Sequence, residues 1–195
     1  NQLVVLDTET LAASVAAAWK YQDVVDVRWI SDKRLLYSLR NQCGENCKYD
    51  FSFHAGVPSA FYAVDRDGKE TREVTFNDRV RRTWRRDSDD VILVSSAAGT
   101  PSEPRHVNLT RMDTRTGERS PIEIRRKVQY VLLGPDDVPH VVWASQEGWT
   151  RWTIDYRASA DGAWTQLETY DPSQFEGGFD GIAFAGPDSL YVVAD

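Results

Sequence analysis

The sequence predicts an all-β fold, namely a partial β-propeller of about four blades in which each complete blade is a four-stranded antiparallel sheet. One local pattern occurs four times: an apolar strand, a short polar turn and a second, more strongly apolar strand. The second strands of the four copies align at Leu35, Val91, Val141 and Leu190. Their separations of 56, 50 and 49 residues are close to the repeat of about 40 to 50 residues that is typical of propeller blades. These second strands are apolar almost throughout, as expected of strands buried on both faces.

A second hairpin completes the repeat. The first hairpins pair residues 25–30 with 34–39, 82–84 with 90–95, 128–133 with 140–144, and 181–184 with 189–193. After the first three of them, further strand-like runs enclose turns at residues 65–69, 113–118 and 158–162. These turns contain Asp and Gly, which favour hairpins because Gly adopts positive φ without steric cost. Each complete repeat is therefore expected to contain four strands.

The N-terminal residues follow the pattern of the second hairpin. Val4–Leu6 is typical of a strand and Asp7–Thr10 of its turn, so Leu11–Lys20 is expected to be the outer strand of a preceding blade. The alanines of this segment also fit a short helix capped by Thr10. The chain starts at Asn1, without Met and already within a strand, which suggests a piece of a longer protein. We expect one partial propeller domain with blades at residues 1–22 (outer half), 23–77, 78–126, 127–172 and 173–195 (inner half).

Composition and charge disfavour two classes of partner. No apolar run approaches the roughly 18 residues that span a bilayer, so no membrane span is expected. Lys and Arg number 23 against 30 Asp and Glu, a net charge of −7, which repels polyphosphates. The one dense basic cluster consists of Arg79, Arg81, Arg82, Arg85 and Arg86. Because no aromatic residues for base stacking are interleaved with it, a solvated edge is favoured over nucleic-acid binding.

Two cysteines bear on the compartment. Cys43 and Cys47 are close enough in sequence to form a small loop disulfide in an oxidising space. That interpretation favours an extracytoplasmic location, and two reduced thiols in the cytoplasm are the alternative. A zinc site would need about two further ligands, and the nearest histidine is His54. No metal site is predicted.

The remaining polar residues predict no catalytic or cofactor-binding site. A serine hydrolase nucleophile lies in Gly-x-Ser-x-Gly, and no such string occurs. The histidines His54, His106 and His140 lack metal-ligand spacing, and His140, beside an apolar strand, is expected to be a hydrogen-bonded core residue. The carboxylate pairs Asp89-Asp90 and Asp136-Asp137 are expected in tight turns, where Asp caps its own backbone.

Aromatic residues supply the only candidates for ligand contact. Most tryptophans fall on expected strands, where packing between blades is the simpler explanation. Trp149 and Trp152 lie near the loop at residues 145–148. They are therefore candidates to face a peptide or carbohydrate ligand.

Several strings resemble one family. The run Val27–Ser38 resembles the inner hairpin of the N-terminal propeller in bacterial prolyl oligopeptidase family serine peptidases, including their dipeptidyl and acylaminoacyl peptidases. Ala60–Gly68 resembles the outer hairpin that follows, and Met112–Glu118 and Tyr156–Trp164 resemble two later hairpins. No adjacent pair of glutamates occurs, so the substrate-anchoring glutamates of the dipeptidyl peptidases are not carried over. No Gly-His to Trp-Asp repeat of the WD class is present.

The resemblance implies a function for the propeller as part of a larger protein. It implies a non-catalytic portion of a periplasmic or secreted peptidase that gates peptide access to a C-terminal α/β-hydrolase domain bearing a Ser-Asp-His triad. That domain is not within these 195 residues. The alternative function is a non-enzymatic propeller that binds a protein or peptide. Unpaired sheet edges at both ends of this partial propeller would also favour self-association.

Overall fold

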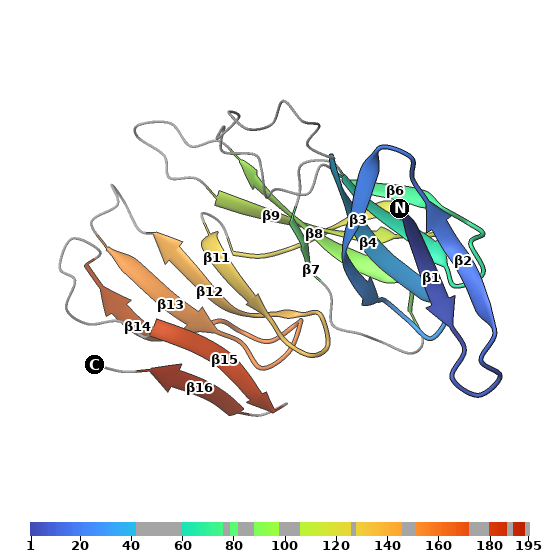
Figure 1. The fold of residues 1–195 in the computed structure, drawn as a ribbon. Helices are drawn as coiled ribbons and strands as arrows, with labels where there is room; N and C mark the ends of the chain where they lie inside the picture. Colours follow the sequence, from blue (N-terminus) through green and yellow to red (C-terminus); the bar gives the residue numbers. More distant parts are fainter. Residues whose placement is uncertain are drawn as a thin grey trace. The chain divides into compact units, whose positions relative to one another are not determined.

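The fold consists of antiparallel β-sheets (Figure 1). The computed structural model describes residues 1–41, 60–75, 79–81, 88–97, 106–125, 128–145, 151–171, 180–186 and 189–193. Within these ranges the chain forms sixteen strands and no helix. The predicted all-β class with several four-stranded antiparallel sheets is therefore confirmed. No sheet formed by the described strands closes on itself.

Consecutive strands pair in sequence order, as short hairpin connections require. The N-terminal hairpin joins β1 (Gln2–Leu6) to β2 (Ala13–Ala18). The second sheet contains β3 (Gln22–Trp29), β4 (Arg34–Asn41), β5 (Ala60–Asp65) and β6 (Arg72–Thr75). The third sheet contains β7 (Arg79–Arg81), β8 (Asp90–Ala97), β9 (His106–Asp113) and β10 (Arg119–Ile122). The fourth sheet contains β11 (Val128–Leu133), β12 (Pro139–Ser145), β13 (Trp152–Tyr156) and β14 (Thr165–Tyr170), and the C-terminal hairpin joins β15 (Asp180–Gly186) to β16 (Ser189–Val193).

The structure replaces one expected element by another and leaves a second outside the described residues. The helix considered for residues 11–20 is wrong, because Ala13–Ala18 forms β2 in register with β1, Val5 opposite Ser14. A helix of that length is marginal in water, whereas pairing with β1 satisfies the backbone and buries Ala16. The strand expected at residues 82–84 lies outside the described residues, and β7 precedes it.

The chain divides into two compact units, Asn1–Leu93 with Arg111–Ser120, and Val94–Thr110 with Pro121–Asp195. In the first unit β4, a central strand of the second sheet, is buried on both faces. Leu35, Tyr37 and Leu39 on one face of β4 share a core with Ala16 of the N-terminal hairpin. Leu36 on the other face belongs to a second core.

That second core joins the second sheet to the third. Leu36 and Val74 from the second sheet pack with Val91, Leu93 and Met112 from the third. Since successive side chains of a strand point to opposite faces, the continuous apolar run of β4 is explained by a neighbouring sheet on each side. The stacking of the N-terminal hairpin on the second sheet is visible in Figure 1.

In the second unit, β12 is the buried strand. Val141 and Val142 are fully buried, and His140 contacts the ring of Phe184 in the C-terminal hairpin edge-on at 5.5 Å between centroids. The His140 ring nitrogens contact the Arg157 carbonyl at 2.7 Å and the Asp136 carboxylate at 3.0 Å. The prediction of a hydrogen-bonded core histidine is thus confirmed.

The fourth apolar strand departs from the predicted burial. In β16 the side chain of Tyr191 is 67% exposed. The neighbouring Leu190 is half-buried, so the described side chains of β16 are covered only in part.

Two hairpin turns require glycine for different reasons. Gly68 in the β5–β6 turn has φ +83°, and a Cβ there would lie 2.8 Å from the Val15 carbonyl oxygen. Gly117 in the β9–β10 turn has φ +81°, but its Cβ would meet only the end of the Arg72 side chain. The first turn is therefore held against the backbone of β2, and the second faces a side chain that can move.

Gly68→Ala is expected to destabilise the protein more than Gly117→Ala. Both variants carry the cost of about 1 to 2 kcal/mol for a side chain at positive φ. Gly68→Ala adds a clash with main-chain atoms, and relieving such overpacking costs about 1 to 3 kcal/mol more. Urea unfolding followed by tryptophan fluorescence compares the two, and equal losses would contradict the close approach of this turn to β2.

Candidate functional site

The residues singled out from the sequence do not converge on one site. Cys43, Cys47, His54 and Trp149 lie outside the described residues, so the disulfide and the first aromatic candidate stay predictions. Trp152 is partly buried on β13 with its ring 6.2 Å from that of Tyr170. Its role toward a ligand also stays a prediction.

Of the charged residues singled out from the sequence, some lie within the described residues and others lie outside them. Arg79 is the one member of the arginine cluster whose side chain is described, and it is exposed. Asp136 accepts the N–H of Val138 at 3.1 Å, which confirms the expected capping of its own turn. Asp89 departs from that expectation, because its carboxylate accepts hydrogen bonds from Ser31 and Arg115.

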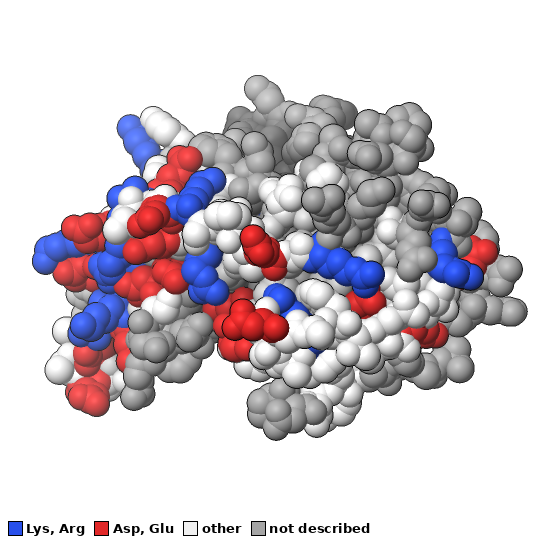
Figure 2. Space-filling model, turned by 180° about the vertical axis from the view of Figure 1, so that it is seen from behind, with Lys and Arg blue, Asp and Glu red and all other residues white. Residues whose placement is uncertain are grey.

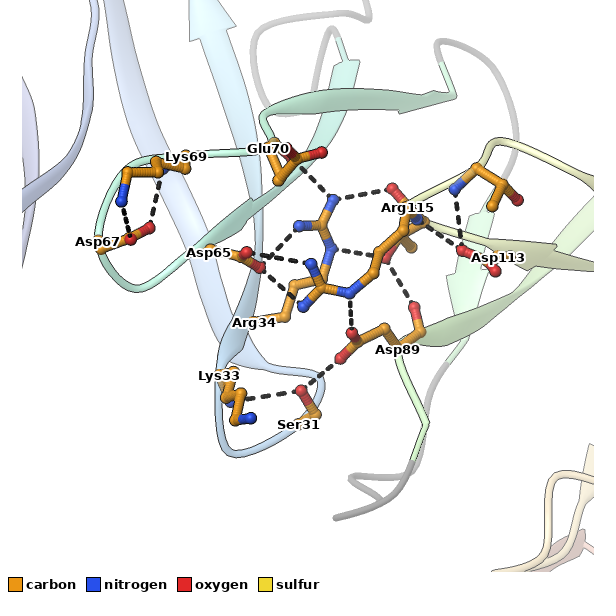
Figure 3. A network of polar contacts seen from close by, with 12 residues as sticks. Ser31, Lys33, Arg34, Asp65, Asp67, Lys69, Glu70, Asp89, Asp113 and Arg115 are labelled. Carbon is orange, nitrogen blue, oxygen red and sulfur yellow. Dashed lines mark hydrogen bonds and ion pairs between the residues drawn. The ribbon is translucent and has the colours of Figure 1, made fainter.

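A polar cavity in the first unit marks the place where Asp89 makes these contacts. It measures about 560 Å³ and is lined by Ser31, Asp32, Lys33, Asp65, Ser88, Asp89 and Arg115. The lining residues lie in the β3–β4 turn, at the end of β5 and in the β9–β10 turn. Ser88 and Asp89 lie just before β8. We refer to Ser31, Arg34, Asp65, Asp89, Thr114 and Arg115 as the turn-end cluster (Figure 3).

Arg34 is the buried centre of this cluster. It begins β4 directly opposite Asp65 of β5, and its side chain is fully buried. The guanidinium donates to the Asp65 carboxylate at 2.8 Å, to the Glu70 carbonyl at 2.9 Å, and to both the hydroxyl and the carbonyl of Thr114 at 2.7 and 2.8 Å. Arg34 makes four hydrogen bonds from three nitrogens, more than the three N–H groups of one lysine ammonium can supply.

Asp65 receives a second guanidinium from the third sheet. Both of its oxygens accept hydrogen bonds from Arg115 at 3.0 Å, and Figure 3 shows the carboxylate between the two arginines. Burial raises the pKa of Asp65, but the hydrogen bonds from Arg115 and Arg34 outweigh it and bring the pKa below the ordinary 3.8. Hydrogen bonding to Asp65 in turn raises the pKa of Arg115. Both groups are therefore charged throughout the neutral range.

Asp89 extends the cluster along the same end of the sheets. The Arg115 Nε and the Ser31 hydroxyl donate to its two carboxylate oxygens, and the Thr114 hydroxyl donates to its backbone carbonyl at 2.7 Å. Ser31, Arg34 and Asp65 belong to the second sheet, whereas Asp89, Thr114 and Arg115 belong to the third. The cluster is a polar clamp between the turn ends of these two sheets.

The geometry suits a structural role better than a chemical one. The Asp65 carboxylate is held ionised by two arginines, so it cannot donate a proton near neutral pH, and a carboxylate engaged in this way is a weak base. The Arg115 guanidinium also pairs with two carboxylates, those of Asp65 and Asp89. Across the described ranges, no three His, Cys, Asp or Glu side chains come together in a way that could hold a metal ion.

Sequence reasoning did not identify this cluster. A signal for it exists in Lys33-Arg34-Leu35-Leu36, where an arginine begins a strand that is otherwise apolar. An arginine in that position has to be paired when the strand is buried. Its partners, 31 and 80 residues away, cannot be read from the local pattern.

Outside the cluster, charge on the described surface is mixed. Figure 2 shows acidic and basic side chains interspersed on the face that it displays. In the portion of the chain that the structure describes, no helix is long and apolar enough to cross a membrane. The chain matches no protein-family model, no curated protein and no solved structure at a significant level.

Asp65→Asn is expected to lower stability at neutral pH and to weaken its dependence on acid pH. The loss at neutral pH should be about 2 to 3 kcal/mol, because the buried Arg34 loses a charged partner and keeps an amide oxygen. A carboxyl group with a depressed folded pKa stabilises the protein above its unfolded pKa, and that stabilisation is lost as pH falls through the folded value. The gap between the urea midpoints of wild type and variant should therefore shrink below pH 3.8.

Asp67→Asn is the matched control in the same turn. Asp67 is half-exposed, and its ion pair with Lys69 lies on the surface, where such pairs contribute little. The hydrogen bonds from Lys69 lower the pKa of Asp67 as well, but the group is exposed and asparagine still accepts the Lys69 N–H, so only a small change in stability is expected. A gap for Asp65→Asn that persists unchanged at low pH would contradict the ionised clamp.

Proposed function

We propose that the chain is part of a β-propeller and forms the non-catalytic propeller portion of a serine peptidase that acts on peptides. In this proposal the propeller limits access to an α/β-hydrolase domain outside these 195 residues. The parent protein is periplasmic or secreted.

The observation that carries the proposal is the burial of β4, a central strand of the second sheet, on both faces. Leu35 and Leu36 are neighbours on β4, and each packs against a different adjacent sheet. In a two-layer sandwich each sheet covers one face of the other and leaves its outer face to solvent. Sheets of consecutive antiparallel strands stacked on both sides are what a propeller requires of its blades.

The serine peptidase family is proposed because the sequences of several hairpins resemble those of its propeller. Val27–Ser38 covers the end of β3, the turn and the first part of β4, and Ala60–Gly68 covers β5 and most of the turn that follows. Met112–Glu118 and Tyr156–Trp164 fall on the turns after β9 and β13. The last three strings thus lie at the turn between the third and fourth strands of successive sheets, which supports one repeated scaffold.

The turn-end cluster supports gating rather than chemistry as the task of this portion. The hydrogen bonds from Arg34 to Thr114 and from Arg115 to Asp65 connect two sheets, which resists their separation at that end. A propeller that admits peptides and excludes larger chains has to keep its sheets from parting. Arginine pairs that span two sheets serve that purpose.

A serine-reactive fluorophosphonate tests the proposal on the longer protein. The full-length product is expected to be labelled at a serine outside residues 1–195, and the 195-residue chain is expected to remain unlabelled under the same conditions. Mass spectrometry locates the label. A folded full-length product that takes no label would overturn the peptidase and leave the non-enzymatic peptide- or protein-binding propeller as the function.

Arg115→Ala in the full-length peptidase is expected to relax the size limit on substrates. Losing the contacts to Asp65 and Asp89 frees the turn ends of two sheets, so kcat/KM for long peptides should rise several-fold relative to short ones. Lys69→Ala, which removes an exposed charge from a neighbouring turn, should leave that ratio unchanged. A parallel fall for both substrate lengths would contradict gating at this end.

A further inference from the structure

The polar cavity beside the turn-end cluster lies within the first unit and has the size of a ligand site. All seven of its lining residues belong to Asn1–Leu93 or Arg111–Ser120. Its volume of about 560 Å³ falls within the range of roughly 300 to 1,000 Å³ that is typical of small-molecule pockets. The described residues that line it are all charged or hydroxyl-bearing. A ligand held there is therefore recognised through polar groups.

Two cations at the cavity have hydrogen-bond donors that the turn-end cluster does not use. The Lys33 side chain is exposed, and within the described ranges its ammonium group has no partner. Arg115 uses three N–H groups, one on Nε for Asp89 and one on each terminal nitrogen for Asp65. A guanidinium has five N–H groups, so two remain, and 37% of the Arg115 side chain is exposed. The cavity can thus donate hydrogen bonds to the oxygens of a ligand.

Asp89 is the carboxylate with the most unused capacity as an acceptor. Its two oxygens accept one hydrogen bond each, from Ser31 and Arg115. An ionised carboxylate can accept about four, and the Asp89 side chain is 20% exposed. Asp65 already accepts three, from Arg34 and Arg115. A donor group on a ligand is therefore best placed beside Asp89.

The formal charges around the cavity cancel. The buried Arg34, which donates to Asp65, adds one positive charge to those of the lining. The lining itself carries three carboxylates and two cations, those of Asp32, Asp65, Asp89, Lys33 and Arg115. A site without net charge favours neither a simple anion nor a simple cation. A molecule with one charge of each sign can interact favourably with both kinds of group.

An uncharged ligand suits such a lining less well. Its entry displaces water from charged groups, and this desolvation is unfavourable unless charged hydrogen-bonding partners replace the water. The two groups with unused capacity have opposite charges and lie on either side of one residue. The Ser31 hydroxyl donates to Asp89 and accepts the backbone N–H of Lys33 at 3.4 Å (Figure 3). The lining therefore offers a positive and a negative group to the same small ligand.

We propose that this cavity binds a zwitterion, either a free amino acid or a short peptide. Its carboxylate contacts Lys33 and Arg115, and its ammonium group contacts Asp89. The ligand uses the donors and acceptors that remain after the two sheets are joined, so the turn-end cluster keeps its structural role. This inference goes beyond gating and does not depend on a hydrolase domain.

Glycine and two analogues with a single charge test the proposal on the ¹⁵N-labelled 195-residue chain. At neutral pH glycine is a zwitterion, glycinamide carries only the ammonium group, and N-acetylglycine carries only the carboxylate. Glycine is expected to shift the NMR signals of the Arg115 Nε–H and the Ser31 amide in a saturable way. Each analogue is expected to bind about tenfold more weakly, because it lacks one set of hydrogen bonds to a charged group.

Lys33→Gln removes a positive charge that the turn-end cluster does not use. The variant should keep the urea midpoint of wild type and bind glycine about tenfold more weakly. Lys69→Gln is the matched control, because Lys69 is an exposed lysine on the β5–β6 turn that does not line the cavity. It should bind glycine like wild type. Lys33→Glu makes the lining more negative and should bind glycinamide more tightly than glycine.

Three outcomes contradict the proposal. The first is a wild-type chain in which glycine produces no saturable shift at the cavity. The second is N-acetylglycine or glycinamide binding as tightly as glycine, which would indicate a site for a single charge. The third is unchanged glycine binding in both Lys33→Gln and Lys33→Glu. Circular dichroism confirms that each variant keeps its strands.

Discussion

A strand that is apolar on both faces can be stable only where both faces are covered, and β4 imposes this requirement on the first unit. Leu35 and Tyr37 point one way and Leu36 the other. One face is covered by the N-terminal hairpin and the other by the third sheet. Because burial of large apolar side chains is the main favourable contribution to folding, the order of layers follows from this strand.

Apolar burial alone leaves the position of one sheet along the other weakly specified, since aliphatic contacts are not directional. The turn-end cluster supplies the direction. Arg34 is fully buried and has to be paired, and its partners come from both sheets. A slip of the third sheet would separate Thr114 from Arg34 and Arg115 from Asp65, which would take two of its four acceptors from the buried Arg34 and one arginine from Asp65. Burying the charges of the cluster costs desolvation free energy, but the cluster aligns the two sheets.

The elements of the fold could be predicted from sequence, and most of the site could not. Strands such as Val128–Leu133 and the Asp-Gly turn at Gly68 follow from local patterns that physical chemistry constrains strongly. The choice between helix and strand for Ala13–Ala18 depended on pairing with β1, which local propensity does not contain. Asp89 was expected to cap its own turn because the side chain is short, and a partner 58 residues away in sequence, Ser31, competed successfully for its carboxylate.

Local sequence pattern predicts both end hairpins, but tertiary packing covers them differently. A two-stranded hairpin is only marginally stable by itself in water, so each needs a surface to pack against. The N-terminal hairpin packs on the second sheet through Leu3 and Val5. The C-terminal hairpin contacts the fourth sheet through the rings of Phe184 and His140 and leaves Tyr191 largely in solvent. An apolar core therefore holds the first hairpin and an aromatic contact holds the second, so the two ends of the strand order are packed by different means.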